Sequence, residues 1–192
     1  VAPQACIEFA KENDWSVRVS QFSLAAERQF PKISIVVLCY NQLDYTKKCV
    51  QSILKQTAYP NYELVLVDNA SIDETAEYLK EIEVLHENVK VVLNTTNRGF
   101  AGGNNDGIRA STGEYIVLLN NDTVVTRGWL TGMVKRFLAG EKKIGIVGPV
   151  TNSIGNEAMV RAGYTGLENM PAAAYTYTAD HMGMTYPHDG VL

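Results

Sequence analysis

The sequence predicts an α/β fold in which helices cover both faces of a mostly parallel sheet. Short apolar runs rich in β-branched residues are typical of strands buried on both faces, and residues 33–40 (ISIVVLCY) are the clearest of them. Segments with the apolar spacing of amphipathic helices separate these runs. Strand and helix alternate four times with short connections, which favours parallel strands joined by right-handed crossovers.

The expected elements follow one another between residues 33 and 147. Strands are expected at residues 33–40, 62–67, 89–93, 115–119 and 144–147. Helices are expected after residue 41 as far as about residue 57, then over residues 71–85, 101–110 and 129–138. Asn41 is a candidate N-cap for the first of these helices, and Ser71 with Glu74 has the spacing of a capping box for the second.

The chain divides into three parts on this pattern. Residues 1–30 show helical spacing and are interpreted as a helical lead-in or the end of an upstream domain. Residues 31–150 carry the strand–helix alternation, and their number is sufficient for one domain with its own core. Residues 151–192 show no clear period, so they are interpreted as the start of a further region that this sequence truncates.

The composition excludes several classes of protein. A net charge of -4 and a pI of about 5.4 do not favour nucleic-acid binding. Cys6, Cys39 and Cys49 form no disulfide framework or zinc pattern, which favours a reducing compartment. Because no apolar stretch approaches the ~20 residues of a membrane span, we expect no integral membrane segment. A cytoplasmic location is expected, with peripheral membrane association left open.

Polar side chains follow the strands, at the edge where ligands bind in parallel sheets. The residues expected there are Tyr40, Asn41, Asp68, Arg98, Gly99, Gly103, Asn104, Asn120, Asn121 and Asp122. Carboxylates and amides suit a base and a ribose, whereas a cation and a metal suit phosphate. Each residue alone could be a turn, cap or packing residue, but their shared placement favours a nucleotide site.

Fingerprints of other sites are missing. The segment GFAGG at residues 99–103 does not fit G-x-G-x-x-G and follows the third strand rather than the first. Neither a G-x-x-x-x-G-K-[ST] phosphate loop nor a G-x-S-x-G nucleophile elbow occurs. His86, His181 and His188 lack metal-ligand spacing, and His86 is interpreted as structural.

Four segments between residues 33 and 150 resemble the nucleotide-binding half of family 2 glycosyltransferases, which have the Rossmann-like GT-A fold. These segments are residues 34–54 (SIVVLCYNQLDYTKKCVQSIL), 63–75 (ELVLVDNASIDET), 97–108 (NRGFAGGNNDGI) and 114–130 (EYIVLLNNDTVVTRGWL). The variants NRGFAGGNN and LLNNDT resemble the rhamnosyltransferase-like branch. The resemblance implies that Tyr40 and Asn41 flank the base and that Asp68 bonds the base or ribose. It also implies that Arg98 and residues 99–105 lie beside the ribose and diphosphate.

The resemblance also implies a divalent metal, Mg²⁺ or Mn²⁺. Asn120, Asn121 and Asp122 match a motif that many members write as Asp-x-Asp, with Asp122 and Asn120 as the expected ligands. A hard cation often takes only one or two protein carboxylates and completes its shell with phosphate oxygens and water. Because Asn120 offers a neutral amide, we expect weak metal affinity without nucleotide.

The implied activity is inverting transfer of a hexosyl or rhamnosyl group from a nucleoside-diphosphate sugar to a glycan or polysaccharide acceptor. Such transfer needs a general base. The acidic residues of the tail, Glu157, Glu168, Asp180 and Asp189, form no paired motif. We therefore expect the base to lie beyond Leu192, and residues 151–192 to begin the acceptor-side region.

Two alternatives remain on the sequence alone. A non-catalytic nucleotide-sugar-binding module of a multi-domain protein would share the same donor site. A nucleotidyltransferase would need a glycine-rich loop with Arg and Lys directly after the first strand, where this chain has NQLD at residues 41–44. The second alternative is therefore disfavoured.

Overall fold

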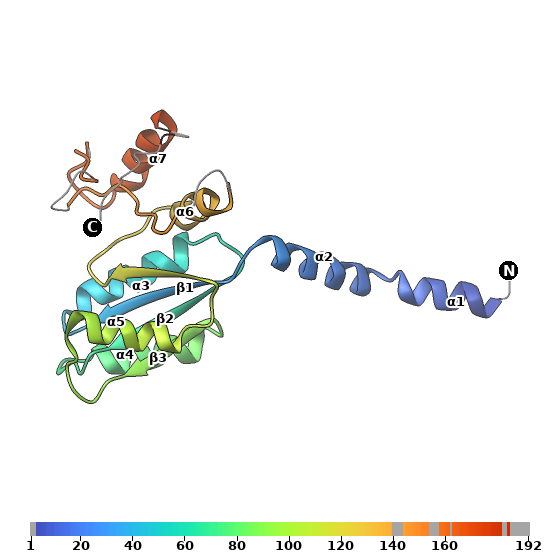
Figure 1. The fold of residues 1–192 in the computed structure, drawn as a ribbon, viewed down its shortest axis with the longest axis horizontal. Helices are drawn as coiled ribbons and strands as arrows, with labels where there is room; N and C mark the ends of the chain where they lie inside the picture. Colours follow the sequence, from blue (N-terminus) through green and yellow to red (C-terminus); the bar gives the residue numbers. More distant parts are fainter. Residues whose placement is uncertain (1–2, 140–143, 154–157, 162, 182–183, 185–192) are drawn as a thin grey trace. The chain divides into compact units, whose positions relative to one another are not determined.

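The computed structural model shows a four-stranded parallel sheet with helices packed against it (Figure 1). The structure describes residues 3–139, 144–153, 158–161, 163–181 and 184. Internal contacts define two compact units, the first formed by residues 1–51 and 59–124 and the second by residues 52–58 and 125–192. The first unit contains the whole sheet.

The strands occur in the order β3-β2-β1-β4 across the sheet. The strands are β1 (Ile33–Cys39), β2 (Tyr62–Asp68), β3 (Val89–Leu93) and β4 (Tyr115–Asn120). The helices are α1 (Pro3–Glu12), α2 (Trp15–Gln29), α3 (Leu43–Gln56), α4 (Thr75–Leu85), α5 (Gly99–Ala110), α6 (Trp129–Leu138) and α7 (Met170–Asp180). Cys39 pairs with Asp68, and Leu38 pairs with Asn120. The strands thus end together at one edge, and the predicted α/β fold is confirmed.

Helix α5 covers one face of the sheet. A Cβ atom added to Gly107 would overlap Val36, and one added to Gly103 would overlap Leu38. The two glycines are four residues apart and therefore lie on one side of the helix. They allow α5 to approach the central strand more closely than any side chain would permit.

Helices α3 and α4 meet at the opposite face, where the side chain of Cys39 lies. The Thr46 hydroxyl of α3 lies beside the Cys39 thiol, and the Lys47 ammonium lies 5.6 Å from the centre of the Tyr78 ring of α4. Cys39 and Cys49 are fully buried. Burial raises the pKa of both thiols, that of Cys49 to about 12, so they remain protonated and serve as core residues, as the sequence indicates.

The prediction of a strand at residues 144–147 is wrong. These residues are described and have no strand conformation, and Ile144 and Ile146 are exposed. Among the described strands, β4 pairs with β1 alone. An apolar run of four residues that includes a glycine gains little from an extended conformation unless a neighbouring strand supplies hydrogen bonds.

Helix α7 appears where the sequence showed no period. Its segment MPAAAYTYTAD begins with a proline in the first turn and continues with three alanines. Both features favour a helix through backbone propensity rather than through apolar spacing. A search for periodicity therefore misses it.

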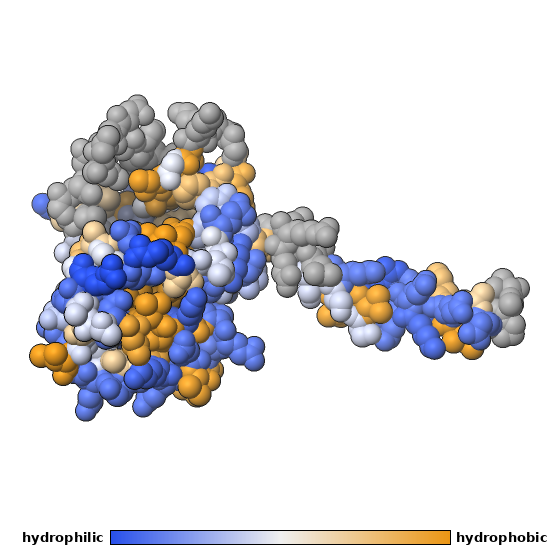
Figure 2. Space-filling model, turned by 60° about the horizontal axis from the view of Figure 1, so that its bottom comes forward, coloured by the Kyte–Doolittle hydropathy of each residue, from blue (hydrophilic) through white to orange (hydrophobic). Residues whose placement is uncertain are grey.

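Helices α1 and α2 occupy most of the segment for which helical spacing was noted. Apolar side chains are exposed on them, including Phe9, Trp15 and Phe22, and apolar patches interrupt their hydrophilic surface (Figure 2). The role of residues 1–30 as a lead-in or the end of an upstream domain stays a prediction. No helix among the described residues combines the length and apolar character needed to cross a bilayer.

The sheet is tied together near its amino ends by the carboxylate of Glu63. Lys32 Nζ lies 2.8 Å from Glu63 Oε2, and Ser34 Oγ donates to Oε1 at 2.5 Å. Thr112 donates from its backbone N–H to Oε1 and from its hydroxyl to Oε2. Burial alone would raise the pKa of Glu63, but the ammonium and these donors outweigh it and lower the pKa to about 2.

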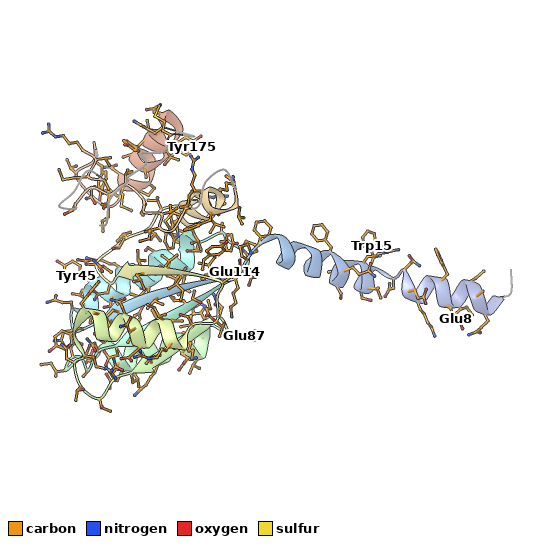
Figure 3. The ribbon with its side chains drawn as sticks, in the orientation of Figure 1. Glu8, Trp15, Tyr45, Glu87, Glu114 and Tyr175 are labelled. Carbon is orange, nitrogen blue, oxygen red and sulfur yellow. The ribbon has the colours of Figure 1, made fainter. Side chains whose placement is uncertain are left out.

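We expect Glu63 to make the stability of the chain depend on pH. Its pKa falls from 4.5 to about 2 on folding, so its contribution is complete above pH 4.5 and is lost as the pH falls towards 2. The shift corresponds to about 3 kcal/mol at most. Urea unfolding at pH 6 and pH 2.5 should show this loss in the wild type and a much smaller loss in Glu63→Gln. The exposed Glu87 (Figure 3) provides the control, since Glu87→Gln should behave as the wild type. Equal pH dependence in both variants would contradict the assignment.

Candidate functional site

Two loops with unusual backbone conformations meet at the carboxyl edge of the sheet. Asn41 and Gln42, after β1, and Ala70, after β2, have positive φ angles of 54°, 61° and 65°. Left-handed conformations cost non-glycine residues about 1 kcal/mol each and cluster at functional sites. The loops are joined because the Asn41 N–H donates to Ser71 Oγ at 2.8 Å and the Ile72 N–H donates to Asn41 Oδ1 at 2.8 Å.

These bonds correct both predicted helix caps. Asn41 does not cap α3, which begins at Leu43, because the Asn41 side chain bonds the neighbouring loop. Ser71 forms no capping box with Glu74, which is the N-cap of α4 and makes no side-chain capping bond. Asp73 instead accepts from Thr75 N at 3.1 Å and from Leu43 N at 3.3 Å. Tertiary neighbours, rather than local sequence, therefore determine the partners of Asn41 and Ser71.

Asp68 lies at the predicted position, at the end of β2. Its residue surface is only 3% exposed. Oδ2 accepts from Ser71 N at 3.2 Å, whereas Oδ1 is buried without a hydrogen-bond partner. Because buried polar atoms are nearly always bonded, an unpartnered carboxylate oxygen indicates a place for an external N–H or O–H donor. Tyr40, at the end of the adjacent strand, is half-exposed.

Asn69, which was not among the predicted site residues, makes four side-chain hydrogen bonds at this edge of the sheet. Its side chain donates to Asn97 Oδ1 at 2.9 Å and to the Gly99 carbonyl at 3.3 Å. It accepts from Asn94 Nδ2 at 3.2 Å and from the Arg98 N–H at 3.0 Å. Asn69 is only 2% exposed. Its place directly after a buried strand was the one available signal, but its partners lie 25–30 residues further along the chain.

Arg98 is held by Asp106 on α5. Arg98 Nε lies 3.1 Å from Asp106 Oδ2, which also accepts from Asn94 Nδ2 at 3.2 Å. Arg109 bonds the other oxygen of the carboxylate. The hydrogen bond from Arg109 and the nearby charge of Arg98 lower the pKa of Asp106, so the carboxylate is anionic near neutral pH. The Arg98 side chain is nevertheless 52% exposed.

Asn120 is the last residue of β4, and Asn121 and Asp122 form the turn that follows it. Asn121 Nδ2 donates to Thr46 Oγ1 of α3 at 3.0 Å, which fixes this turn. Asn120 and Asp122 are exposed. In the part of the chain that the structure describes, no group of three or more His, Cys, Asp or Glu side chains could hold a metal. The oxygen donors of Asp122 and Asn120 fit a hard cation that draws its remaining ligands from phosphate and water.

Three residues of α5 were also predicted for the site. Gly99 begins the helix with φ of 69° and is exposed. Gly103 is buried against Leu38, and Asn104 is buried and donates to the Phe100 carbonyl at 2.9 Å. The structure thus gives Gly103 and Asn104 contacts within the fold, and their roles towards a nucleotide stay predictions.

The described histidines have structural surroundings. His86 is the C-cap of α4, and its N–H bonds the Ile82 carbonyl. His181 stacks on the Tyr177 ring at a centroid distance of 4.0 Å, at the end of α7. His188 and two of the tail acidic residues, Glu157 and Asp189, lie outside the described residues.

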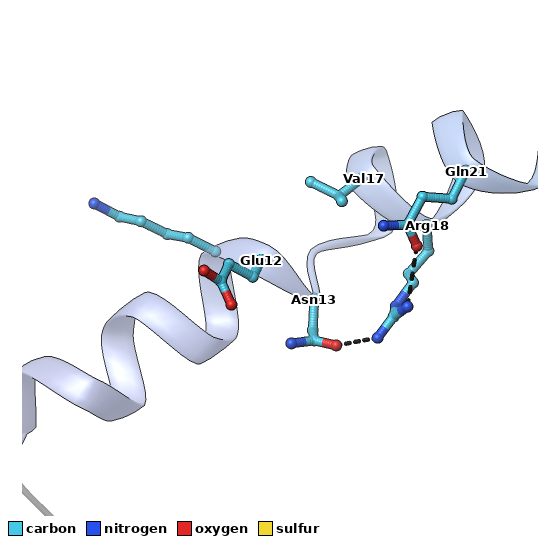
Figure 4. A pocket seen from close by; sticks show the side chains of 6 residues that line it. Glu12, Asn13, Val17, Arg18 and Gln21 are labelled. Atoms are coloured by element: carbon cyan, nitrogen blue, oxygen red, sulfur yellow. Dashed lines mark hydrogen bonds between the residues drawn. The ribbon is translucent and has the colours of Figure 1, made fainter. Parts of the chain in front are cut away.

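A concavity lies where α1 meets α2, apart from the strand ends (Figure 4). It is lined by Lys11, Glu12, Asn13, Val17, Arg18 and Gln21. Arg18 bonds Asn13 and, at 3.0 Å, Gln21, so the lining groups satisfy one another. None of the predicted site residues lines it.

The parallel sheet, with carboxylate and amide groups at its carboxyl edge, defines an α/β protein of the GT-A type. The family profile described as "Glycosyl transferase family 2" matches residues 34–184. The chain therefore belongs to glycosyl transferase family 2. The rhamnosyltransferase-like branch stays a prediction.

Two named relatives each match about half of this chain. The poly(ribitol-phosphate) beta-glucosyltransferase of Bacillus spizizenii is 36% identical over 96 residues, which cover 49% of this chain and 15% of the relative. Glycosyltransferase GlyG of Streptococcus pneumoniae is 39% identical over 93 residues, which cover 48% of this chain and 31% of the relative. The chain thus matches about a third or less of the length of these relatives.

Solved structures show the same fold. The mannosyltransferase PcManGT from Pyrobaculum calidifontis, in complex with GDP-Man and Mn²⁺, has a TM-score of 0.51 and 30% identity. The match covers 55% of this chain and 32% of that protein. S. aureus TarS 1–349 in complex with UDP-GlcNAc has a TM-score of 0.50 and 27% identity, and the match covers 56% of this chain and 31% of that chain.

The strained residue Ala70 gives a test of the loop geometry. Ala70→Gly should raise the free energy of unfolding by about 1 kcal/mol, because glycine adopts a positive φ without steric cost. Ala101→Gly, in the first turn of α5, should lower it by about 1 kcal/mol, because there glycine only adds backbone entropy to the unfolded state. Urea denaturation of both variants measures the difference, and a loss of stability in Ala70→Gly would show that the left-handed conformation is absent.

Proposed function

We propose that this chain carries the donor site of an inverting glycosyltransferase, which binds a nucleoside-diphosphate sugar with Mg²⁺ or Mn²⁺. The acceptor is a glycan or polysaccharide, and the transferred sugar is a hexose or rhamnose. The relatives' names support a polymer acceptor, and the GDP-Man and UDP-GlcNAc complexes support a nucleotide-sugar donor.

The observation that carries the proposal is the buried, unpartnered Oδ1 of Asp68. It lies at the end of β2, beside the two strained loops and the exposed Tyr40. A nucleobase N–H or a ribose hydroxyl would satisfy this oxygen and remove the cost of leaving it unbonded. Asp68 and the adjacent loops therefore bind and orient the nucleoside.

Arg98 and the residues at the end of β4 bind the phosphate end of the donor. Arg98, whose side chain is half-exposed, supplies positive charge. Asp122 and Asn120 would hold the divalent cation, whose chemistry is to neutralise charge on the leaving nucleoside diphosphate. With one carboxylate and one amide, the protein contributes little affinity for the metal alone, so metal and nucleotide bind together.

The donor site is tested by calorimetric titration of the chain with UDP, dTDP and GDP, each with and without Mn²⁺. We expect one nucleotide to bind, with an affinity about tenfold higher when Mn²⁺ is present, because Asp122 would hold a cation that neutralises phosphate charge. Asp122→Ala should abolish this metal dependence. Titration with Mn²⁺ alone should show only weak binding.

The matched control is Glu114→Ala. Glu114 is an exposed carboxylate directly before β4, at the opposite end of that strand (Figure 3). The Glu114→Ala substitution should leave the nucleotide affinity and its dependence on Mn²⁺ unchanged. If the wild type binds none of the three nucleotides, the donor site is refuted. Nucleotide binding with no sugar transfer, either by this chain or by a longer form that contains it, would favour the non-catalytic module instead.

The proposal also places the general base outside residues 1–192. Asp180 is the exposed last residue of α7 and has no acidic neighbour in sequence, and Asp189 lies outside the described residues. In an active form of the enzyme, Asp180→Asn and Asp189→Asn should each keep turnover within about twofold of the wild type, whereas loss of a general base costs about 10²–10⁴-fold. Loss of turnover with intact nucleotide binding in either variant would identify that residue as the base.

A further inference from the structure

The segment between β3 and α5 is bonded to the end of β2 by the Asn94 N–H, which donates to the Asp68 carbonyl at 2.9 Å, and by the side chain of Asn69. Its carboxamide donates to the Asn97 side chain and the Gly99 carbonyl, and it accepts from the Arg98 N–H and the Asn94 side chain. All four partners lie in residues 94–99. An amide that uses both donors and its acceptor oxygen in this way holds one backbone arrangement.

The same network extends to the guanidinium of Arg98. Asn94 Nδ2, which donates to Asn69, also donates to Asp106 Oδ2 at 3.2 Å. That oxygen is 3.1 Å from Arg98 Nε. Asn69 thus contacts Arg98 directly by accepting from the Arg98 N–H, and it is linked to the guanidinium indirectly through Asn94 and Asp106. Arg98 is therefore held both at its backbone N–H and at its guanidinium.

We propose that Asn69 is a positioning residue of the donor site, which orients Arg98 for the diphosphate without itself touching the ligand. This inference rests on the proposed function, because it assigns the diphosphate as the group that Arg98 binds. Asn69 is only 2% exposed, so its contribution reaches the ligand through the segment that it holds.

The chemistry of the amide explains why aspartate cannot replace it. Asn69→Asp keeps the acceptor for the Arg98 N–H but removes both donors and places negative charge beside two oxygens. Asn97 could turn its amide to donate to the new carboxylate. That rotation would remove the acceptor that now receives the Gly99 N–H at 2.8 Å. No single rotation therefore restores the network.

The test compares the affinities of a nucleoside diphosphate and the matching monophosphate by calorimetry. Orientation of Arg98 should matter more for the diphosphate, so Asn69→Ala and Asn69→Asp should reduce the ratio of the two affinities by about tenfold. Arg98→Ala should reduce it equally. The double variant Asn69→Ala, Arg98→Ala should lose no more than Arg98→Ala alone, because the two residues act as one unit. Additive losses would overturn the proposal.

Asn61→Ala is the matched control. The Asn61 side chain also donates to a backbone carbonyl, that of Phe30 at 2.8 Å, but it lies directly before β2 at the amino end of the sheet. It should lower the melting temperature and leave the ratio of affinities unchanged. If Asn69→Ala lowers only the melting temperature, its role is structural and the proposal fails.

Amide hydrogen exchange separates this proposal from the donor-site proposal, because it needs no nucleotide. In Asn69→Ala the Arg98 N–H loses its acceptor, so its exchange rate and that of Gly99 should rise at least about tenfold. Unchanged exchange would show that Asn69 does not hold the segment, whatever the nucleotide binding. If exchange rises but the wild type binds no nucleotide, the donor site itself is refuted and the assignment of the diphosphate falls with it.

Discussion

The register of β1 against its two neighbours is the constraint on which the rest of the structure depends. β1 is buried on both faces, so a slip of one residue would move its side chains to the wrong sides of the sheet. The observed register places Cys39 beside Asp68 and Leu38 beside Asn120. The loops that carry the candidate donor groups therefore begin at the same level, and each extends from a rigid strand rather than from another loop.

The two ends of the sheet serve different purposes. At the amino end, the Glu63 carboxylate is satisfied by an ammonium, two hydroxyls and a backbone N–H, and this network stabilises the fold. At the carboxyl end, Asn41, Gln42 and Ala70 hold unfavourable backbone conformations, and an oxygen of Asp68 is unbonded. Such costs persist only where surrounding bonds fix the geometry, which the contacts between Asn41 and Ser71 provide.

The sheet and its site edge could be predicted from the sequence because they depend on properties that are local or periodic. An apolar run predicts a buried strand, and the residues after it must lie at its carboxyl end. Contacts between loops depend instead on residues that are far apart in the sequence. Ser71 and Glu74 fit a capping box, yet the Ser71 hydroxyl bonds Asn41, 30 residues earlier. The importance of Asn69 was missed for the same reason. The strand expected at residues 144–147 does not form because it has no neighbouring strand among the described residues, and a local pattern cannot show whether such a neighbour exists.

In the proposed donor site, the pairing of Arg98 with Asp106 would limit the free energy that a phosphate gains from this cation. A cation that is already paired with a carboxylate contributes to affinity only the difference in free energy between its ligand-bound and carboxylate-paired states. This contribution is smaller than that of an unpaired cation. The compensation is orientation, because the ligand does not have to order a long side chain when it binds. In the proposed site, the neutral amide of Asn120 would act in the same direction, since it would leave a metal weakly held until phosphate oxygens complete its shell. In the proposed donor site, both features would favour charges that assemble only around a bound nucleoside diphosphate.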